Sequence, residues 1–227
     1  MKLLGATASP YVMRVLMFAR LKGLDLPLAP TPGGGSPRSD EYRALNPIGK
    51  IPSLIVDDQC IAESEVICEF LEDVHPEPSG LPADSKGRAT SRLISRITDL
   101  YISPHLSSLF RQMNPTGRDQ SVVDTAAADM AKGLGYLEHF MGDGPFCVGS
   151  EPSLGDCALA PYMALLKKTV FPAFSEVVDP TEADGRMATW WQAIEGNEIC
   201  KATVEEYGTA IDQFMTGMGA KISGQKT

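Results

Sequence analysis

The chain has 227 residues, of which 43% are hydrophobic and 22% are charged, so it can bury a substantial core without disulfide bonds. Its formal net charge of −9 at pH 7 would repel a phosphate backbone, which argues against nucleic acid as a partner. The sequence contains no run near the roughly 20 apolar residues of a membrane-spanning helix, which argues against a membrane partner.

The first part of the chain alternates strand and helix signals. Pro10 suits the first turn of a helix, where its missing N–H is harmless, and Gly23 is a stop signal. Residues 30–39 hold three prolines and three consecutive glycines, which predicts a loop. The pattern predicts strands at residues 2–6, 26–29, 53–56 and 59–61, and helices at residues 10–22 and 63–74. This order predicts a small mixed sheet with helices packed against it.

A change of composition marks a linker. Residues 75–87 contain three prolines and two glycines, which is incompatible with a helix or a central strand. We therefore predict an N-terminal domain at residues 1–76, a linker at 77–86 and a second domain at 87–227.

The second part has helical patterns throughout. We expect helices at residues 86–112, 119–140, from 153 onward, 185–194 and 197–216, with a frayed tail at 217–227. In the first of these helices, Pro104 is expected to introduce a kink. The side chains that we expect on its inward face are Leu93, Ile97, Leu100 and Tyr101. Residues 153–156, Ser-Leu-Gly-Asp, predict a capping box at the start of a later helix.

Five cysteines and three histidines are spread along the chain. The odd number of cysteines and the lack of a Cys-x-x-Cys pair indicate free thiols, which fits a reducing cytoplasm. No local pair of histidine and cysteine has zinc-ligand spacing, so we predict no metal site.

The pair Glu63-Ser64 begins a predicted helix. Backbone N–H groups at a helix start are unpaired and carry partial positive charge, so with the Ser64 hydroxyl they could hold a ligand carboxylate. Glu63 could hold an ammonium group beside it. The two residues would then suit the head group of an amino acid, although an ordinary acidic first turn has the same sequence.

Pro52 directly precedes a predicted strand and has no N–H for the strand ladder. The sequence alone favours a trans Ile51–Pro52 bond, because only about 5–6% of X–Pro bonds are cis. A cis bond would instead turn the N–H and C=O of Ile51 outward to pair with an extended peptide. Lys50 would then meet the carboxylate of that peptide.

Ser9 lies at the predicted turn between the first strand and the first helix. It suits the N-cap of that helix. Its hydroxyl could alternatively donate a hydrogen bond to a bound thiolate, which favours the charged form and lowers the thiol pKa.

Several motifs of this chain together resemble the glutathione transferase superfamily, over nearly the whole length. Each motif is weak alone, but all occur in order and at suitable spacings. They are the Ser9-Pro10 turn, residues 46–52 (Asn-Pro-Ile-Gly-Lys-Ile-Pro), Glu63-Ser64, residues 81–89 at the linker, and Val148-Gly149 followed by residues 153–156.

The resemblance implies a thioredoxin-like N-terminal domain with a mixed four-stranded sheet, followed by an all-α domain. It implies a cis Ile51–Pro52 bond, against the expectation from sequence alone. It also implies glutathione as the co-substrate. The γ-glutamyl carboxylate would meet Glu63 and Ser64, the cysteinyl backbone would pair with Ile51, and the glycyl carboxylate would approach Lys50.

The residue at the first turn separates the classes of this family. Ser9 followed by Pro10 and Tyr11 is similar to serine-type classes such as tau, which makes Ser9 the implied catalytic residue and Thr7 a backup hydroxyl. Omega-type members have a cysteine at this turn, and residues 1–59 contain none. Zeta-type isomerases resemble Ser-Ser-Cys-Ser-x-Arg-Val. Because this chain has Tyr11 at the cysteine position, we exclude the zeta class.

The resemblance implies a cytoplasmic, homodimeric glutathione S-transferase that conjugates the glutathione thiolate to a small apolar electrophile, as in detoxification. Asp99 is the implied acid that reaches the γ-glutamyl ammonium of the other subunit. We expect the electrophile between the Ser9 turn and the long helix, near Tyr11, Tyr101 and His105, although packing is the simpler role for the last two. The alternatives are a specialised dehalogenase, lyase or isomerase on the same site, and a non-catalytic protein that binds glutathione or another ligand.

Overall fold

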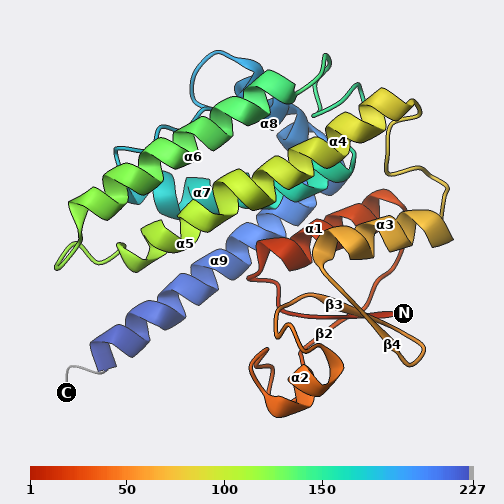
Figure 1. Ribbon diagram of the computed structural model, residues 1–227, viewed down its shortest axis with the longest axis horizontal. Helices are drawn as coiled ribbons and strands as arrows, with labels where there is room; N and C mark the ends of the chain where they lie inside the picture. Colours follow the sequence, from red (N-terminus) through yellow and green to blue (C-terminus); the bar gives the residue numbers. More distant parts are fainter. Residues whose placement is uncertain (225–227) are drawn as a thin grey trace.

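The computed structural model describes the backbone of residues 1–224 and the side chains of residues 1–217. A small sheet with its helices occupies one end of the molecule, and a helical bundle occupies the other (Figure 1). This arrangement confirms the predicted fold class, a thioredoxin-like α+β domain followed by an all-α domain.

The sheet has four strands in the order β2-β1-β3-β4. The strands are β1 (Lys2–Leu4), β2 (Leu28–Ala29), β3 (Ser53–Val56) and β4 (Gln59–Ala62). β1 pairs parallel with β2 and antiparallel with β3, which in turn pairs antiparallel with β4. All four predicted strands are therefore present, and the first two are shorter than predicted.

Three helices pack around this sheet. α1 (Pro10–Leu21) and α3 (Ser64–Val74) lie on one side of it, and α2 (Asp40–Leu45) lies on the other (Figure 1). The sequence analysis predicts α1 and α3 but not α2. Residues 12–19 of α1 are all buried, because this helix also packs against α7 and α9 of the bundle. The turn before α1 therefore sits at the boundary between the two parts of the chain.

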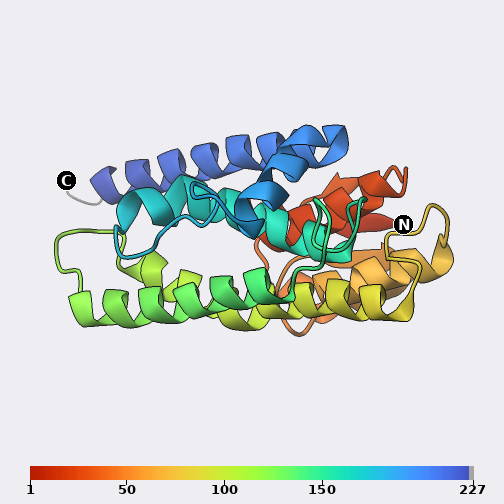
Figure 2. The same cartoon turned by 90° about the horizontal axis from the view of Figure 1, so that it is seen from above.

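The C-terminal part is all helical, as predicted. Its elements are α4 (Ser85–Ile97), a π-helical turn η1 (Thr98–Ile102), α5 (Ser103–Arg111), α6 (Gln120–Phe140), α7 (Leu154–Ala173), α8 (Arg186–Gly196) and α9 (Glu198–Gly224). Figure 2 shows α7 between a layer formed by α4, α5 and α6 and a layer formed by α9. α9 continues beyond the predicted end at residue 216. The last part of the predicted tail, residues 225–227, lies outside the described residues.

The predicted continuous helix at residues 86–112 is interrupted by η1. The N–H of Ser103 donates to the C=O of Thr98, five residues earlier, which is the bond of a π-helix. Pro104 then falls in the first turn of α5, where its missing N–H costs little. The irregularity predicted at Pro104 thus begins one turn before it.

The predicted inward face of this segment is wrong at three of its four positions. The exposed side chains are Leu93, Leu100 and Tyr101, at 38%, 50% and 47%. α4 packs against α7 through small residues instead, and a Cβ atom on Gly155 would lie only 2.8 Å from the carbonyl oxygen of Ser91. Two helices that pack this closely need small residues at their contact. Leu93 therefore lies on a different face of α4 from the one that packs against α7.

The predicted capping box at the start of α7 is present. The fully buried carboxylate of Asp156 accepts hydrogen bonds from the N–H and hydroxyl of Ser153 at 2.8 and 3.0 Å. It also accepts from the N–H of Cys147 at 2.8 Å and from Nε1 of Trp190 at 2.9 Å. One side chain thus joins α7, the loop before it and α8.

A buried ion pair holds the segment after α3 against the N-terminal domain. Nζ of Lys22 lies 2.6 Å from Oε2 of Glu72 and also donates to the C=O of Pro78 at 2.7 Å. The Glu72 carboxylate accepts further bonds from the Ser79 hydroxyl at 2.8 Å and the Gly80 N–H at 2.9 Å. Both charges are therefore paired, as burial requires.

We expect Glu72→Gln to lower the free energy of unfolding by about 3 kcal/mol at neutral pH, because Lys22 would be buried without its counter-charge. Burial raises the pKa of Glu72, but hydrogen bonds from Lys22, Gly80 and Ser79 lower it overall below its usual value. Such a carboxylate stabilises the fold above its unfolded pKa of about 4.3, and this contribution disappears as the pH falls through the folded pKa.

Urea unfolding of wild type and Glu72→Gln at neutral pH and at about pH 3 checks this expectation, since the difference between them shrinks in acid. Glu69→Gln is the control, because Glu69 forms a more exposed ion pair with Arg92 and should cost less than about 1 kcal/mol. A difference between wild type and Glu72→Gln that stays constant with pH would contradict the assigned role of the carboxylate.

All five cysteines are free thiols, and burial raises the pKa of Cys68 and Cys147. Among the described residues, no group of three or more His, Cys, Asp or Glu side chains is arranged to hold a metal ion. Within the same part of the chain, no helix is both long enough and apolar enough to cross a membrane.

Candidate functional site

Two adjoining cavities lie where α1 and α3 face the helical bundle. The polar cavity, of about 510 Å³, is lined by Tyr11, Lys50, Ile51, Pro52, Glu63, Ser64, Glu65, Val66, Glu69, Arg96 and Asp99. The apolar cavity, of about 640 Å³, lies between the Ser9 turn, segment 37–51 and helices α5, α7 and α9. Its lining includes Ser9, Pro10, Tyr11, Arg38, Arg43, Ile48, Lys50, Ile51, Ser103, Leu106, Phe110, Tyr162, Leu165, Ile211, Phe214 and Met215. Both cavities have Tyr11, Lys50 and Ile51 in their linings, so the two adjoin at these residues.

Arg14 of α1 is the buried cation behind the polar cavity, and it is 1% exposed. Its guanidinium donates to both carboxylate oxygens of Asp99, at 2.5 and 3.0 Å, and to Oγ of Ser64 at 3.1 Å. Burial lowers the pKa of Arg14, but the hydrogen bond and charge of Asp99 raise it overall above its usual value. Arg14 is therefore a fixed positive charge that ties α1, α3 and η1 together.

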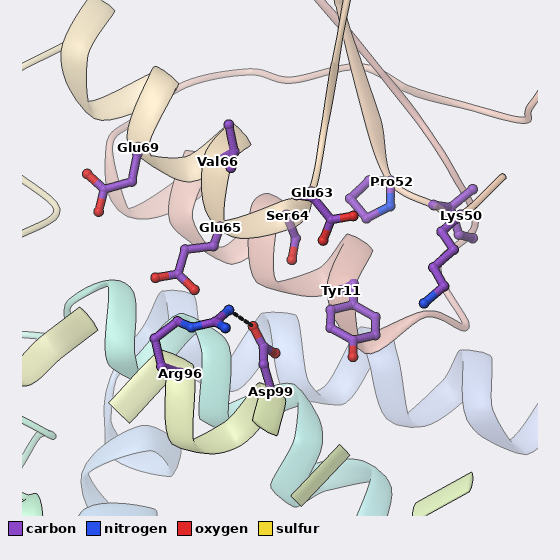
Figure 3. Close-up of a pocket in the computed structure, with 11 residues that line it drawn as sticks. Tyr11, Lys50, Pro52, Glu63, Ser64, Glu65, Val66, Glu69, Arg96 and Asp99 are labelled. Carbon is purple, nitrogen blue, oxygen red and sulfur yellow. Dashed lines mark ion pairs between the residues drawn. The ribbon is translucent and has the colours of Figure 1, made fainter. Parts of the chain in front are cut away.

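Asp99, the acid that the resemblance implies for the other subunit, is paired within its own chain. Its carboxylate is occupied by the guanidinium of Arg14 in the same chain, and Nη1 of Arg96 lies 4.0 Å from it. Figure 3 shows Asp99 and Arg96 below the start of α3, on the side of the cavity opposite Lys50. The carboxylate belongs to its own chain's polar cavity, and its two cations largely neutralise it.

Glu63 and Ser64 form the start of α3 beside the polar cavity. Glu63 has a φ of 68°, an uncommon conformation for a residue with a side chain, and it turns the chain sharply into the helix. The Ser64 oxygen accepts from Arg14, so its hydroxyl proton is free to donate to another group. This proton and the free N–H groups of the first turn make the end of α3 suitable for an anion.

Side-chain hydrogen bonds from α2 and the residue after it fix the backbone of the segment that carries Lys50. The buried Tyr42 hydroxyl and the amide of Asn46 donate to the C=O of Lys50 at 2.7 and 3.0 Å. The Asn46 side chain also accepts from the N–H of Ile48 at 3.1 Å. The Ile51–Pro52 bond is cis, as the resemblance implies and against the expectation from sequence alone. The exposed Lys50 side chain extends toward Tyr11 (Figure 3).

Ser9 is the N-cap of α1, where its oxygen accepts from the N–H of Val12 at 3.4 Å. The cap uses a lone pair and leaves the hydroxyl proton free, so both roles considered from sequence are compatible. Ser9 lines the apolar cavity next to Tyr11. Thr7, the backup hydroxyl, is absent from the linings of both cavities among the described residues.

Tyr101 and His105 do not lie in either cavity. Tyr101 is half exposed and its ring packs edge-on against Tyr136, with centroids 5.5 Å apart. His105 lines a separate shallow pocket beside α6. The expectation that these two residues contact the electrophile is therefore wrong. The extra residue of η1 rotates the helix, so that Ser103 faces the apolar cavity instead.

Three residues of this site are not predicted from the sequence: Arg14, Ser103 and Tyr162. The signal for Arg14 is its position inside the otherwise apolar run of residues 12–19, because a charge in such a place must be paired. Ser103 and Tyr162 give no comparable signal, since their placement depends on η1 and on the packing of α7.

Comparisons with known proteins agree with this geometry. A family model for the glutathione S-transferase N-terminal domain matches residues 3–79, and one for the C-terminal domain matches residues 120–192. The maleylacetoacetate isomerase of Pseudomonas aeruginosa is 34% identical over 72% of this chain and 80% of its own length. That of Rattus norvegicus is 33% identical over 66% of this chain and 71% of its own.

A solved structure of a bacterial zeta-class maleylpyruvate isomerase is similar in fold, with a TM-score of 0.70 and 23% identity over 89% of this chain and 96% of the other. The tau-like assignment with exclusion of the zeta class is therefore wrong. It rested on the Ser9-Pro10-Tyr11 turn alone, whereas the similarity to maleylacetoacetate isomerases extends over about two thirds of the chain or more. The matched domains and these relatives show that the chain belongs to the glutathione S-transferase family of glutathione-dependent enzymes.

Proposed function

We propose that this enzyme binds glutathione in the polar cavity and directs its thiolate at an electrophilic carbon in the apolar cavity. The observation that carries the proposal is that the two cavities adjoin at Tyr11, Lys50 and Ile51, next to Ser9 in the lining of the apolar one. One cavity offers charged and hydrogen-bonding groups for a peptide, and the other offers apolar walls for a second substrate. Substrates held in both have their reacting atoms side by side, which replaces a bimolecular encounter by an oriented one.

The groups of the polar cavity complement the charges of glutathione. The γ-glutamyl carboxylate meets the Ser64 hydroxyl and the N–H groups at the start of α3, with the buried charge of Arg14 behind them. The exposed carboxylate of Glu63 receives the ammonium group. Lys50 receives the glycyl carboxylate, and the backbone of Ile51 pairs with the cysteinyl residue.

Ser9 is the group that stabilises the thiolate in this proposal. Its proton is free, because the N-cap bond to Val12 uses only the serine oxygen as acceptor. A donor to the thiolate favours the charged form and lowers the thiol pKa, which increases the fraction of nucleophile at neutral pH.

Calorimetry with glutathione, followed by rates with a chlorodinitrobenzene-type aromatic, tests this function. We expect saturable glutathione binding, thiolate absorbance of the bound form at neutral pH, and a rate well above the uncatalysed background. Glutathione binding without a lowered thiol pKa would contradict the catalytic proposal and favour a ligand-binding protein. Absence of glutathione binding would overturn the assignment of the polar cavity.

A second candidate reaction is glutathione-dependent cis–trans isomerisation of an unsaturated dicarboxylate. The relatives named maleylacetoacetate isomerase favour it. So do Arg38, Arg43 and Lys50, because the lining of the apolar cavity among the described residues holds these three cations and no carboxylate. Conversion of maleylacetoacetate with glutathione present and with glutathione omitted tests it directly. A rate equal to the uncatalysed one in both cases would exclude this reaction.

We also propose that the enzyme acts as a cytoplasmic homodimer. The five free cysteines fit a reducing compartment. Val66 lines the polar cavity and exposes 53% of its surface. Leu100 and Tyr101, which follow Asp99 of the same lining, expose 50% and 47%, so a second copy could cover these side chains. We expect sedimentation analysis to give a dimer for wild type and a monomer for Leu100→Glu. A monomeric wild type, or a dimeric Leu100→Glu, would contradict this interface.

A further inference from the structure

Three hydroxyl groups form a connected chain beneath the apolar cavity. The Tyr162 hydroxyl donates to Oγ of Ser103 at 2.9 Å, and Oγ of Ser103 lies 2.8 Å from the Tyr11 hydroxyl. The two tyrosine rings pack edge to face, with centroids 5.5 Å apart. This series of hydroxyls joins α1, α5 and α7. These hydroxyls have no part in the glutathione contacts described above.

Tyr162, the buried end of this series of hydroxyls, sets the direction in which the hydrogen bonds are donated. Tyr162 is 2% exposed, and burial raises its pKa well above the usual value, so it stays a neutral donor. A serine hydroxyl that accepts from Tyr162 retains one proton, which it can donate to the Tyr11 oxygen. The proton of Tyr11 is then free for the cavity. Hydrogen bonds that run in one direction polarise one another, so Tyr11 becomes a stronger donor than an isolated phenol.

The local backbone supports a functional role for this arrangement. The π-helical bond from Ser103 to Thr98 inserts one residue into the helix and turns the Ser103 side chain toward Tyr11. Such turns are frequent at functional sites. Figure 3 shows the Tyr11 ring extending away from Ser64, so that its hydroxyl lies on the side away from the anion-binding end of α3. The same residue lines both cavities, where the thiolate and the second substrate meet.

We propose that Tyr11 is a catalytic hydrogen-bond donor to an oxygen of the second substrate, with Ser103 and Tyr162 as positioning residues, and that the preferred electrophiles are α,β-unsaturated carbonyl compounds. This inference rests on the proposed function. The glutathione sulfur bonds to the β-carbon, the π pair of the C=C bond forms a new double bond between the α-carbon and the carbonyl carbon, and the π pair of the C=O bond moves to the oxygen. Tyr11 donates to the resulting enolate oxygen. The α-carbon then takes a proton from water, which replaces the proton that the thiol released.

The test compares two electrophiles of similar size: 4-phenylbut-3-en-2-one, which forms an enolate, and benzyl chloride, which expels chloride and develops no charge on oxygen. We expect Tyr11→Phe to lower kcat for the enone about 100-fold, the loss typical of removing one oxyanion donor. In the same variant, we expect the turnover of benzyl chloride to stay within about 3-fold of wild type, and likewise the glutathione affinity measured by calorimetry. Neither process needs the hydroxyl proton of Tyr11.

Ser103→Ala should lower enone turnover less, by roughly 10-fold, because Tyr11 keeps its hydroxyl but loses its partner. Ser103→Thr restores the hydroxyl and the enone rate. Ser108→Ala is the matched control on the same helix, since Ser108 lies outside both cavities and should leave both rates unchanged. The ratio of enone to chloride rates separates this role from loss of packing, which would lower both.

Equal losses for both electrophiles in Tyr11→Phe would overturn the inference and leave the proposed function intact. A larger enone loss in Ser103→Ala than in Tyr11→Phe would make serine the terminal donor and also overturn it. If wild type turns over neither electrophile faster than background, the proposed conjugation reaction itself fails.

Discussion

We expect Ser9→Ala to lower kcat/KM for conjugation by about 100-fold or more, the loss expected when a donor to a reacting anion is removed. The variant should also raise the pKa of the bound glutathione thiol, because the thiolate loses its hydrogen bond while the thiol does not need one. Ultraviolet thiolate absorbance across a pH series measures that pKa directly. Ser9→Thr keeps a hydroxyl and should retain most of the activity.

The N-cap role of Ser9 requires a control, because its loss alone costs about 1 kcal/mol of stability. Asp84→Ala removes a comparable cap, at the start of α4, from a residue outside both cavities. It should lose similar stability and keep its activity. If Ser9→Ala left the thiol pKa unchanged while Asp84→Ala behaved as expected, the thiolate would have another donor.

The largest loss of stability is expected for Asp156→Ala, at about 5 kcal/mol of unfolding free energy. Its fully buried carboxylate accepts four hydrogen bonds, and each donor left buried without a partner costs about 1–3 kcal/mol. For a chain of this length each kcal/mol lowers Tm by roughly 2–4 °C, so thermal unfolding by circular dichroism should detect the change easily.

Asp119→Ala provides the comparison for Asp156. Asp119 caps α6 through the same type of hydrogen bond, but it is exposed to water. We expect Asp119→Ala to cost much less than Asp156→Ala, because water replaces the lost contacts. Equal losses for the two variants would mean that the Asp156 network contributes no more than an ordinary cap.

The sequence predicts those features that depend on local patterns. The helix beginning at Pro10, the strands predicted at residues 53–56 and 59–61 and the capping box at Ser153 all follow from neighbouring residues, and all are present. The resemblance adds the cis Ile51–Pro52 bond, for which the residues themselves give no sign. The resemblance also names Glu63 and Ser64 as binding residues, and in the structure both line the polar cavity.

Features that depend on contacts between distant elements are not predictable in this way. The burial of Ser91 rather than Leu93 follows from how closely α4 approaches α7, which no pattern within α4 reveals. The position of Tyr101 depends on a π-helical turn that shifts the helix register by one residue. Arg14 meets Asp99 only because two segments 85 residues apart pack together.

The guanidinium of Arg14 has its partners on both sides of the boundary between the two parts of the chain. Ser64 belongs to the thioredoxin-like part and Asp99 to the helical part. A thioredoxin-like half separated from its bundle would keep the cation and lose the anion that balances it. The end of α3 that we propose for anion binding thus depends on both parts of the chain. An ancestor that recombined this half with a different bundle would have kept the site only if the new partner supplied a carboxylate at the same place.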